Sequence, residues 1–319
     1  MKTIIFISIM PIILVSIAVS GWVYEGQWGS YGTGDGQFAN PWGIDIASNN
    51  DVYVADTGNN RVQYFTSTGI FLGKWGSLGS EDGQFNNPSG IAVAQNGIIY
   101  VVDIYNHRVQ YFTSSGTFLG KWGTQGYADG QFLFPRGIAI APNGNVYVSD
   151  CGNHRIQYFT PTGTFIGKWG LHGSGDGQFK NPWGIAVAPN SNVYVADSYN
   201  YRIQYFTSIG TFLGKWGSQG SDDGQFMYPY GIAVAPNGNI YVADTLNHRI
   251  QYFTSTGTFL GKWGSNGTGD GQFKSPFDIV IGPNGKAYVA DAYNHRVQYF
   301  HYDTSIEPTS LGIVKTLFR

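Results

Sequence analysis

The chain has 319 residues, of which 16% are aromatic, so it carries more buriable apolar surface than disordered chains do. Eighteen basic and twenty acidic residues leave a formal charge of −2 without charged runs, which argues against nucleic acid as a partner. The single cysteine, Cys151, excludes an intramolecular disulfide.

The first twenty residues are typical of a targeting segment. Lys2 is followed by uncharged, mostly apolar residues from Thr3 to Ser20, and Ala18 and Ser20 have the small side chains and spacing of a cleavage site. This pattern predicts a signal peptide over residues 1–20, with an uncleaved membrane anchor as the alternative, because roughly eighteen apolar residues just span a bilayer core. Either interpretation predicts a protein that is secreted or is an extracytoplasmic protein anchored to a membrane.

One sequence unit then recurs six times. In the fourth unit, residues 182–187, 193–197, 202–206 and 211–216 are rich in β-branched and aromatic residues and are separated by turns of Gly, Asn and Pro. Four short strands in a unit of roughly 40 to 50 residues predict one blade of a β-propeller. The unit has a strict period of 47 residues, marked by Asp-Gly-Gln-Phe segments that begin at Asp35, Asp82, Asp129, Asp176, Asp223 and Asp270.

The two ends of the repeated region predict how the propeller closes. The sixth unit lacks its fourth strand after Phe300, whereas residues 24–28 match a fourth strand with no first three strands before it. Pairing these ends leaves no open sheet edge. We therefore predict an all-β fold, a six-bladed β-propeller of four-stranded blades closed by the N-terminal strand, over residues 21–303. Residues 304–319 are interpreted as a C-terminal tail.

Two sets of repeated residues have structural interpretations. One Trp in each unit is expected in the core between blades, since burying a large apolar side chain stabilises a protein by roughly 1.5 to 3 kcal/mol. An Asp five residues before an Arg, as in Asp197 and Arg202, predicts a bidentate ion pair that braces the loop between the second and third strands. Six metal-binding carboxylates are the alternative, which the nearby cations disfavour.

The repeat unit resembles the NHL repeat. The segments Asp-Gly-Gln-Phe, Pro-x-Gly-Ile-Ala-Val, Tyr-Val-Ala-Asp, Asn-His-Arg-Ile-Gln-Tyr-Phe and Gly-Lys-Trp-Gly match its pattern, and the match covers the chain from Tyr24 to Phe300. The resemblance implies a propeller of the kind that binds protein or RNA in tripartite-motif ubiquitin ligases, senses ligands in bacterial receptor kinases, or forms the peptide-amidating lyase. The repeat alone does not fix the function.

Each of these implied functions requires particular residues. Intrinsic ligase activity needs a zinc module rich in cysteine and histidine, which one cysteine cannot build. The lyase resemblance implies a metal held by histidines near the ring axis. One repeat position carries histidine in four units, but Asn60 and Tyr201 fill it in the other two, so solvated turn residues are the favoured interpretation. These four histidines are His107, His154, His248 and His295.

A catalytic site should appear as a departure from the repeat, because catalysis needs different groups in different roles. The sequence predicts no catalytic residue, no metal ligand and no cofactor, since neither a nucleophile with its base nor an unmatched carboxylate pair is apparent. Cys151 is interpreted as a tolerated substitution, and His172 and His301 as loop residues.

The departures that we identify gather on one face. Propeller topology places the loops between blades on the same face as the loops between second and third strands. The residue after each first-strand proline varies there, as Trp42, Ser89, Arg136, Trp183, Tyr230 and Phe277, and the loops add Tyr105, Tyr199, Leu246 and Tyr293. Aromatic residues and Arg dominate binding hot spots. The predicted ligand-binding residues are Trp42, Arg136, Trp183, Tyr230, Phe277, Tyr105, Tyr199 and Tyr293; the alternative is that these rings only fill gaps between blades.

The leading hypothesis is therefore a binding or sensor module for an extracellular protein, peptide or glycan at this aromatic channel mouth. One alternative is a metal-dependent propeller lyase or hydrolase. The other is an architectural cell-surface module that associates with itself.

Overall fold

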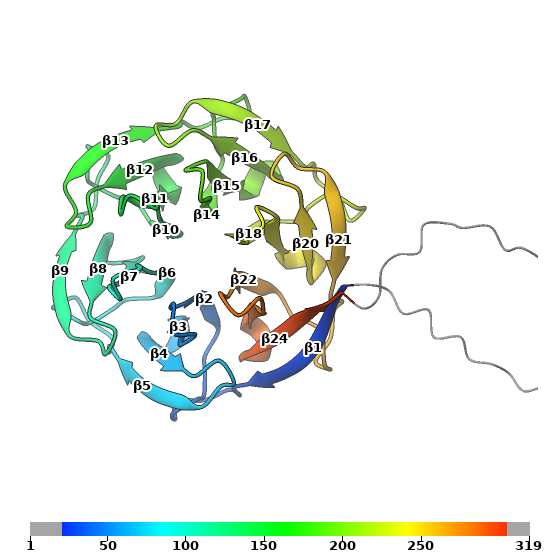
Figure 1. Cartoon of the computed structure of the whole chain (residues 1–319). Coiled ribbons are helices and arrows are strands. Elements are labelled where there is room, and N and C mark those ends of the chain that lie inside the picture. Colours follow the sequence, from blue (N-terminus) through cyan, green and yellow to red (C-terminus); the bar gives the residue numbers. More distant parts are fainter. Residues whose placement is uncertain (1–20, 305–319) are drawn as a thin grey trace, which may run out of the picture.

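The computed structural model describes residues 21–304, which form six four-stranded antiparallel sheets around a central axis (Figure 1). The predicted six-bladed propeller is confirmed. From the axis outward, the first strands are β2 (Pro41–Ile46), β6 (Pro88–Val93), β10 (Ile138–Ile140), β14 (Pro182–Val187), β18 (Pro229–Val234) and β22 (Pro276–Ile281). The second strands are β3 (Val52–Asp56), β7 (Ile99–Asp103), β11 (Val146–Asp150), β15 (Val193–Asp197), β19 (Ile240–Asp244) and β23 (Ala287–Asp291).

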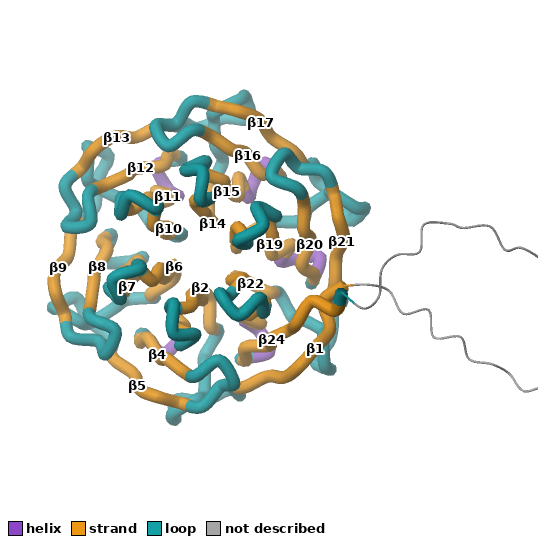
Figure 2. Tube along the Cα trace, viewed as in Figure 1, coloured by secondary structure: helices purple, strands orange, loops and turns teal. Residues whose placement is uncertain are grey.

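The outer half of each blade completes the sheet. The third strands are β4 (Arg61–Phe65), β8 (Arg108–Phe112), β12 (Arg155–Phe159), β16 (Arg202–Phe206), β20 (Arg249–Phe253) and β24 (Arg296–Asp303). The fourth strands are β5 (Phe71–Trp75), β9 (Phe118–Trp122), β13 (Phe165–Trp169), β17 (Phe212–Trp216), β21 (Phe259–Trp263) and β1 (Gly21–Trp28). Short 3-10 turns, purple in Figure 2, follow five second strands, at Thr57–Asn59, Cys151–Asn153, Ser198–Asn200, Thr245–Asn247 and Ala292–Asn294.

Packing between blades explains the strand sequences. Every residue of the second strands is buried, because neighbouring blades cover both faces of each sheet, and so these strands are continuous apolar runs that end in Asp. The fourth strands instead alternate between partly buried and exposed residues, since their outer edge meets solvent. The second strands are therefore mainly apolar because they lie inside the ring, and the fourth strands alternate because they lie at its outer edge.

The N-terminal strand closes the ring in the last blade. β1 pairs antiparallel with β24 from Gly21, opposite Asp303, to Trp28, opposite Val297. Both strands are longer than the expected segments 24–28 and 296–300. His301 therefore lies in a strand, and its interpretation as a loop residue is wrong.

The repeated tryptophans join neighbouring blades, as predicted. Trp216 at the end of β17 lies against Tyr194 and Tyr205 of its own blade and against Phe253 of the next, with ring centroids 5.7 Å apart in the last case. Phe226, from the loop between these blades, contacts the same Phe253 ring. Each such cluster is a small core between two sheets.

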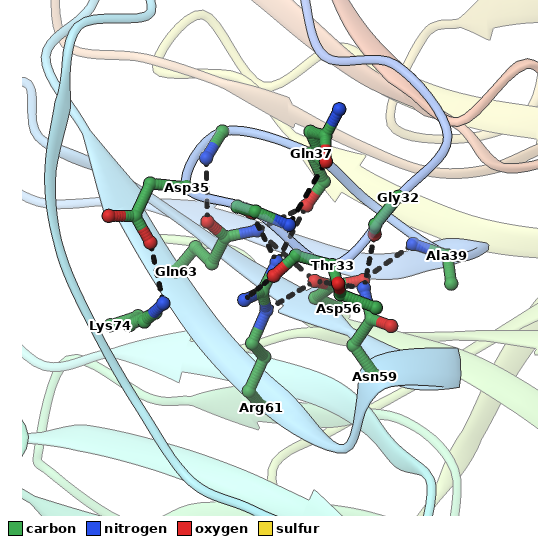
Figure 3. A network of polar contacts seen from close by, with 12 residues as sticks. Gly32, Thr33, Asp35, Gln37, Ala39, Asp56, Asn59, Arg61, Gln63 and Lys74 are labelled. Atoms are coloured by element: carbon green, nitrogen blue, oxygen red, sulfur yellow. Dashed lines mark hydrogen bonds and ion pairs between the residues drawn. The ribbon is translucent and has the colours of Figure 1, made fainter.

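The Asp–Arg pair of each blade forms a buried network rather than a bidentate pair, as Figure 3 shows for the first blade. Arg61 Nε donates to Asp56 Oδ2 over 2.7 Å, and this is its one contact with the carboxylate. Its other nitrogens donate to the carbonyls of Thr33, Gly34 and Gln37 in the preceding loop between blades. The predicted bidentate geometry is wrong, because the guanidinium spans the blade and that loop. The carboxylate also accepts bonds from Asn59 Nδ2, Gln63 Nε2 and the Ala39 amide.

Candidate functional site

The six variable residues after the first-strand prolines meet at one end of the central channel. They line a hollow of about 50 Å³ on the face formed by the loops between blades and by the loops between second and third strands, which we name the mouth face. The hollow is small because the side chains fill most of the opening. These residues are Trp42, Ser89, Arg136, Trp183, Tyr230 and Phe277.

Arg136 lies at the centre of an aromatic stack across this opening. Its guanidinium carbon is 4.5 Å from the ring centroid of Trp183 and 5.4 Å from that of Trp42. Trp183 is stacked on Tyr230 with centroids 3.7 Å apart, and Trp42 on Phe277 with centroids 5.1 Å apart. The guanidinium and Tyr230 thus occupy the two faces of Trp183, and the side chains close the channel mouth.

Three tyrosines surround this stack at the rim. Tyr105, Tyr199 and Tyr293 follow second strands and have 50%, 39% and 46% of their surface exposed. Tyr293 contacts Phe277 of the stack, with ring centroids 5.9 Å apart. The three tyrosines lie outside the hollow, where the sequence analysis expected them. The structure brings all eight predicted residues to one face, with the tyrosines more accessible than the central rings.

Further exposed apolar side chains on the mouth face escaped the sequence analysis. They occupy loop positions at which most of the other blades carry small or polar residues, and a comparison of the blades at each position would have found them. They are Tyr31, Leu78, Tyr127, Phe134 and Leu171. On the opposite face of the ring, within residues 21–304, the exposed large apolar side chains are Ile70 and Ile209.

Unpaired cations also lie on the mouth face. Of the lysines and arginines in residues 21–304, only Arg136, Lys180 and Lys274 have no carboxylate within ion-pairing distance. Lys180 and Lys274 are exposed and occupy equivalent positions in loops between blades. Their main-chain oxygens accept the amides of Tyr199 and Tyr293, which places each lysine beside a rim tyrosine.

The repeat matches a known family. Residues 38–65, 85–112, 132–159, 179–206, 226–253 and 273–300 each match the NHL repeat, and together these segments make up more than half of the chain. The chain belongs to the NHL-repeat family. Protein brain tumor of Drosophila melanogaster is 40% identical over 47 residues, which are 15% of this chain and 4% of that protein. The match therefore spans a small part of each of the two chains.

Solved structures share the fold at low identity. A streptogramin B lyase structure has a TM-score of 0.63 and 15% identity, covering 89% of this chain and 98% of that chain. A Bacteroides thetaiotaomicron protein of unknown function has a TM-score of 0.68 and 19% identity, covering 86% and 76%. Virginiamycin B lyase from Staphylococcus aureus with quinupristin has a TM-score of 0.60 and 14% identity, covering 88% and 98%. At these identities the likeness concerns the fold alone.

The four repeated histidines of this NHL propeller are bonded between blades. His107 Nδ1 accepts the Phe134 amide of the next loop over 3.1 Å, and the other three histidines make equivalent bonds. Asn60 Oδ1 does the same in the first blade. The four histidines are turn residues, as predicted, but their Nδ1 atoms accept main-chain amides instead of facing solvent, and His107 is buried. No three His, Cys, Asp or Glu side chains in the described part of the chain are grouped so that they could hold a metal ion.

These bonds give the protein a testable sensitivity to acid. Burial lowers the pKa of His107, partly opposed by Asp150 and Asp103, so the folded protein holds the neutral acceptor form. The stabilisation is complete above the unfolded pKa of about 6.5 and is lost as the pH falls toward the lower folded pKa. As the pH falls from about 7 to about 5, we expect the wild type to lose this contribution and His107→Asn to keep its own. The difference in unfolding free energy, measured by urea denaturation, should therefore shift in favour of His107→Asn. A pH-independent difference would contradict this role.

Cys151 is buried beside Arg136. Burial raises the pKa of its thiol to about 11, although Arg136 and Asn181 lower it in part. The thiol is therefore neutral near pH 7 and is a poor nucleophile, which agrees with its interpretation as a tolerated substitution.

Two carboxylates in the channel depart from the repeat. The expectation that the chain has no unmatched carboxylate pair is therefore wrong. Asp45 replaces an Ala or Val of the other first strands, and Asp278 replaces a Gly. Both line a cavity of about 280 Å³ that is otherwise mainly Ile, Val, Ala and Gly. Asp45 accepts the amides of Ile46 and Val93, and Asp278 those of Ile44 and Ile279. Aligning the six first strands would have found both.

Burial controls the protonation of this pair. It raises the pKa of Asp45 to about 6 and that of Asp278 to about 8, and the neighbouring Asp45 charge contributes to the latter. The folded pKa of Asp278 exceeds the unfolded one, so its contribution to stability is lost as the pH rises between about 4 and about 8. We expect Asp278→Gly to become progressively more stable than the wild type over that range in urea denaturation. The exposed Asp35→Ala is the control, and parallel curves for Asp278→Gly and the wild type would refute the assignment.

Proposed function

We propose that this NHL propeller is a binding module that holds a protein or peptide partner on its mouth face. The observation that carries the proposal is the unequal distribution of exposed apolar side chains. Nine large ones lie on this face, against the two isoleucines of the opposite face, while seven more are spread around the outer wall on β24 and the fourth strands. Exposed apolar and aromatic patches rimmed by polar groups are typical of interaction sites. The nine are Tyr31, Leu78, Tyr105, Tyr127, Phe134, Leu171, Tyr199, Leu246 and Tyr293.

The arrangement of the rings favours a polypeptide over a glycan. Sugars and nucleobases are held against a free aromatic face. Both faces of Trp183 are already covered, by Arg136 and Tyr230. The most exposed aromatic groups are tyrosines of the rim and of the loops between blades, including Tyr31 and Tyr127, and their rings and hydroxyl groups suit main-chain and side-chain contacts of a peptide.

The other candidate functions have less support. A propeller lyase would need metal ligands, but the Nδ1 atoms of the repeated histidines are engaged by main-chain amides in separate blades. An architectural module would bind itself through the same apolar face. Placement outside the cytoplasm rests on residues 1–20, which lie outside the described residues, and stays part of the proposal. Within residues 21–304, no helix is long and apolar enough to span a bilayer.

The test is selection of peptides from a random dodecapeptide phage library on the full chain. We expect binders whose affinity for Tyr105→Ala, Tyr199→Ala and Tyr293→Ala variants falls by about tenfold or more, because exposed tyrosines are frequent hot spots. Ile70→Ala and Ile209→Ala on the opposite face are matched controls that should leave affinity unchanged. Absence of binders, or equal loss in both sets, would overturn the proposal. Concentration-dependent self-association in light scattering would favour the architectural module.

A further inference from the structure

We propose that the partner presents a carboxylate to Arg136, so that the mouth face recognises an acidic peptide segment. This inference rests on the proposed function and names the chemistry of its ligand. It is carried by the position of an unpaired arginine at the centre of the aromatic stack, and by the charges around it.

Arg136 differs from every other arginine in residues 21–304. The other six each contact a buried carboxylate in their own blade. Arg136 is partly buried, contacts no carboxylate, and has its Nε atom buried without a hydrogen-bond partner. A guanidinium that is partly removed from water gains most from a charged acceptor, because ionised hydrogen bonds are about twice as strong as neutral ones.

The structure around Arg136 holds the side chain without neutralising it. The rings of Trp183 and Trp42 contact the guanidinium, whose nitrogens pair with no carboxylate of residues 21–304. The neighbouring Cys151 thiol is neutral, as described above. Asp278 also borders the hollow, but both of its oxygens accept main-chain amides, and its pKa of about 8 keeps it protonated near pH 7.

A residue that departs from the repeat in the third blade supports the main chain at this arginine. Ser149 stands where the other second strands carry Ala or Val. Its carbonyl accepts the Arg136 amide over 3.0 Å, and its hydroxyl accepts the Gly137 amide over 2.7 Å. The same hydroxyl donates to the carbonyl of Trp183 in the next blade. These bonds fix the main chain at Arg136 and so hold the start of its side chain at the hollow.

The remaining charges of the mouth face fit an acidic ligand. Lys180 and Lys274 are exposed, unpaired and adjacent to the rim tyrosines Tyr199 and Tyr293. A peptide that contacts these tyrosines would therefore pass two more cations. Among residues 21–304, the carboxylates of the mouth-face loops that lack an ion pair are Glu81, Asp222 and Asp270, of which only Asp270 shares a loop with one of these lysines. Three cations form no continuous basic groove along which a phosphate backbone could run, so RNA is the less suitable anion.

The experiment pans the same dodecapeptide library on the full chain and on Arg136→Gln. We expect Asp and Glu to be enriched among wild-type binders and not among Arg136→Gln binders. For a selected peptide made synthetically, replacing its acidic residues by Gln or Asn should weaken binding to the wild type by about tenfold to a hundredfold. Lys74→Gln, on an outer strand, is the matched control for loss of a positive charge and should bind normally.

The possible results separate the two proposals. Binders that lack acidic residues, or that bind Arg136→Gln as well as the wild type, overturn the carboxylate proposal and leave the binding function intact. Absence of any binder overturns both. If Arg136→Gln does not fold, the acidic-to-amide peptides and the Lys180→Gln, Lys274→Gln double variant test the proposal on a folded protein. Tighter binding of an oligouridylate RNA than of any selected peptide would also refute it.

Discussion

Replacing Asp197 by Ala is expected to lower the free energy of unfolding by about 3 to 5 kcal/mol. The carboxylate accepts Arg202 Nε over 2.7 Å and three further hydrogen bonds. The Arg202 side chain is only 8% exposed, so the variant leaves a buried cation without its counter-charge. The loss would be measured by urea denaturation at neutral pH.

The same blade contains a matched control. Lys215 and Asp176 also form an ion pair, but their side chains are 45% and 54% exposed. Solvent screens such a pair, so Lys215→Ala should change stability by less than about 1 kcal/mol. If Asp197→Ala costs no more than Lys215→Ala, the buried network does not stabilise the blade.

Removal of β1 is expected to produce the second large effect. A chain that begins at Gly29 should lose most of its thermal stability and associate with itself, whereas a chain that begins at Gly21 should remain a stable monomer. Without β1, the edge of β24 is left unpaired, and such edges template association. The ring contacts of Trp22 with Trp263 and of Trp28 with Tyr299 are also lost.

Calorimetry and light scattering distinguish the two chains. A monomeric, cooperatively unfolding chain from Gly29 with an unchanged transition temperature would show that the ring does not need its closing strand. Self-association that disappears when a synthetic peptide of residues 21–28 is added would identify the edge of β24 as the cause.

Strict periodicity made the fold predictable. Six copies in phase determine strand order, blade number and the place of the closing strand, because each repeated residue must occupy the same environment in every blade. The repeat could not determine hydrogen-bond geometry. The Asp–Arg spacing predicted an ion pair, but the carbonyls that Arg61 binds belong to a loop about 27 residues earlier, at distances that only the tertiary structure fixes.

The sequence predicted which residues meet at the candidate site, but it did not predict how their side chains are arranged. Propeller topology placed Trp42, Arg136 and Trp183 at one channel mouth. Their stacking depends on rotamers and on the channel diameter, which a sequence does not contain. The predicted site contained loop residues and the residues after the first-strand prolines. It did not include Asp278, which lies inside an otherwise uniform first strand. The hydrogen bonds of the repeated histidines could not be predicted, because their partners lie in the next blade.

Near-identical blades create an ambiguity during folding, since a free strand could approach the wrong partner. The closing strand carries residues that reduce this ambiguity. Glu25 of β1 forms an ion pair with Lys286, whose position in the other blades holds uncharged or acidic residues. Gln27 Oε1 accepts Arg296 of the same blade. Arg296 has an equivalent in every blade, so it is the Glu25–Lys286 pair that favours docking of β1 at the last blade, which protects the ring from misassembled intermediates and from strand exchange between molecules.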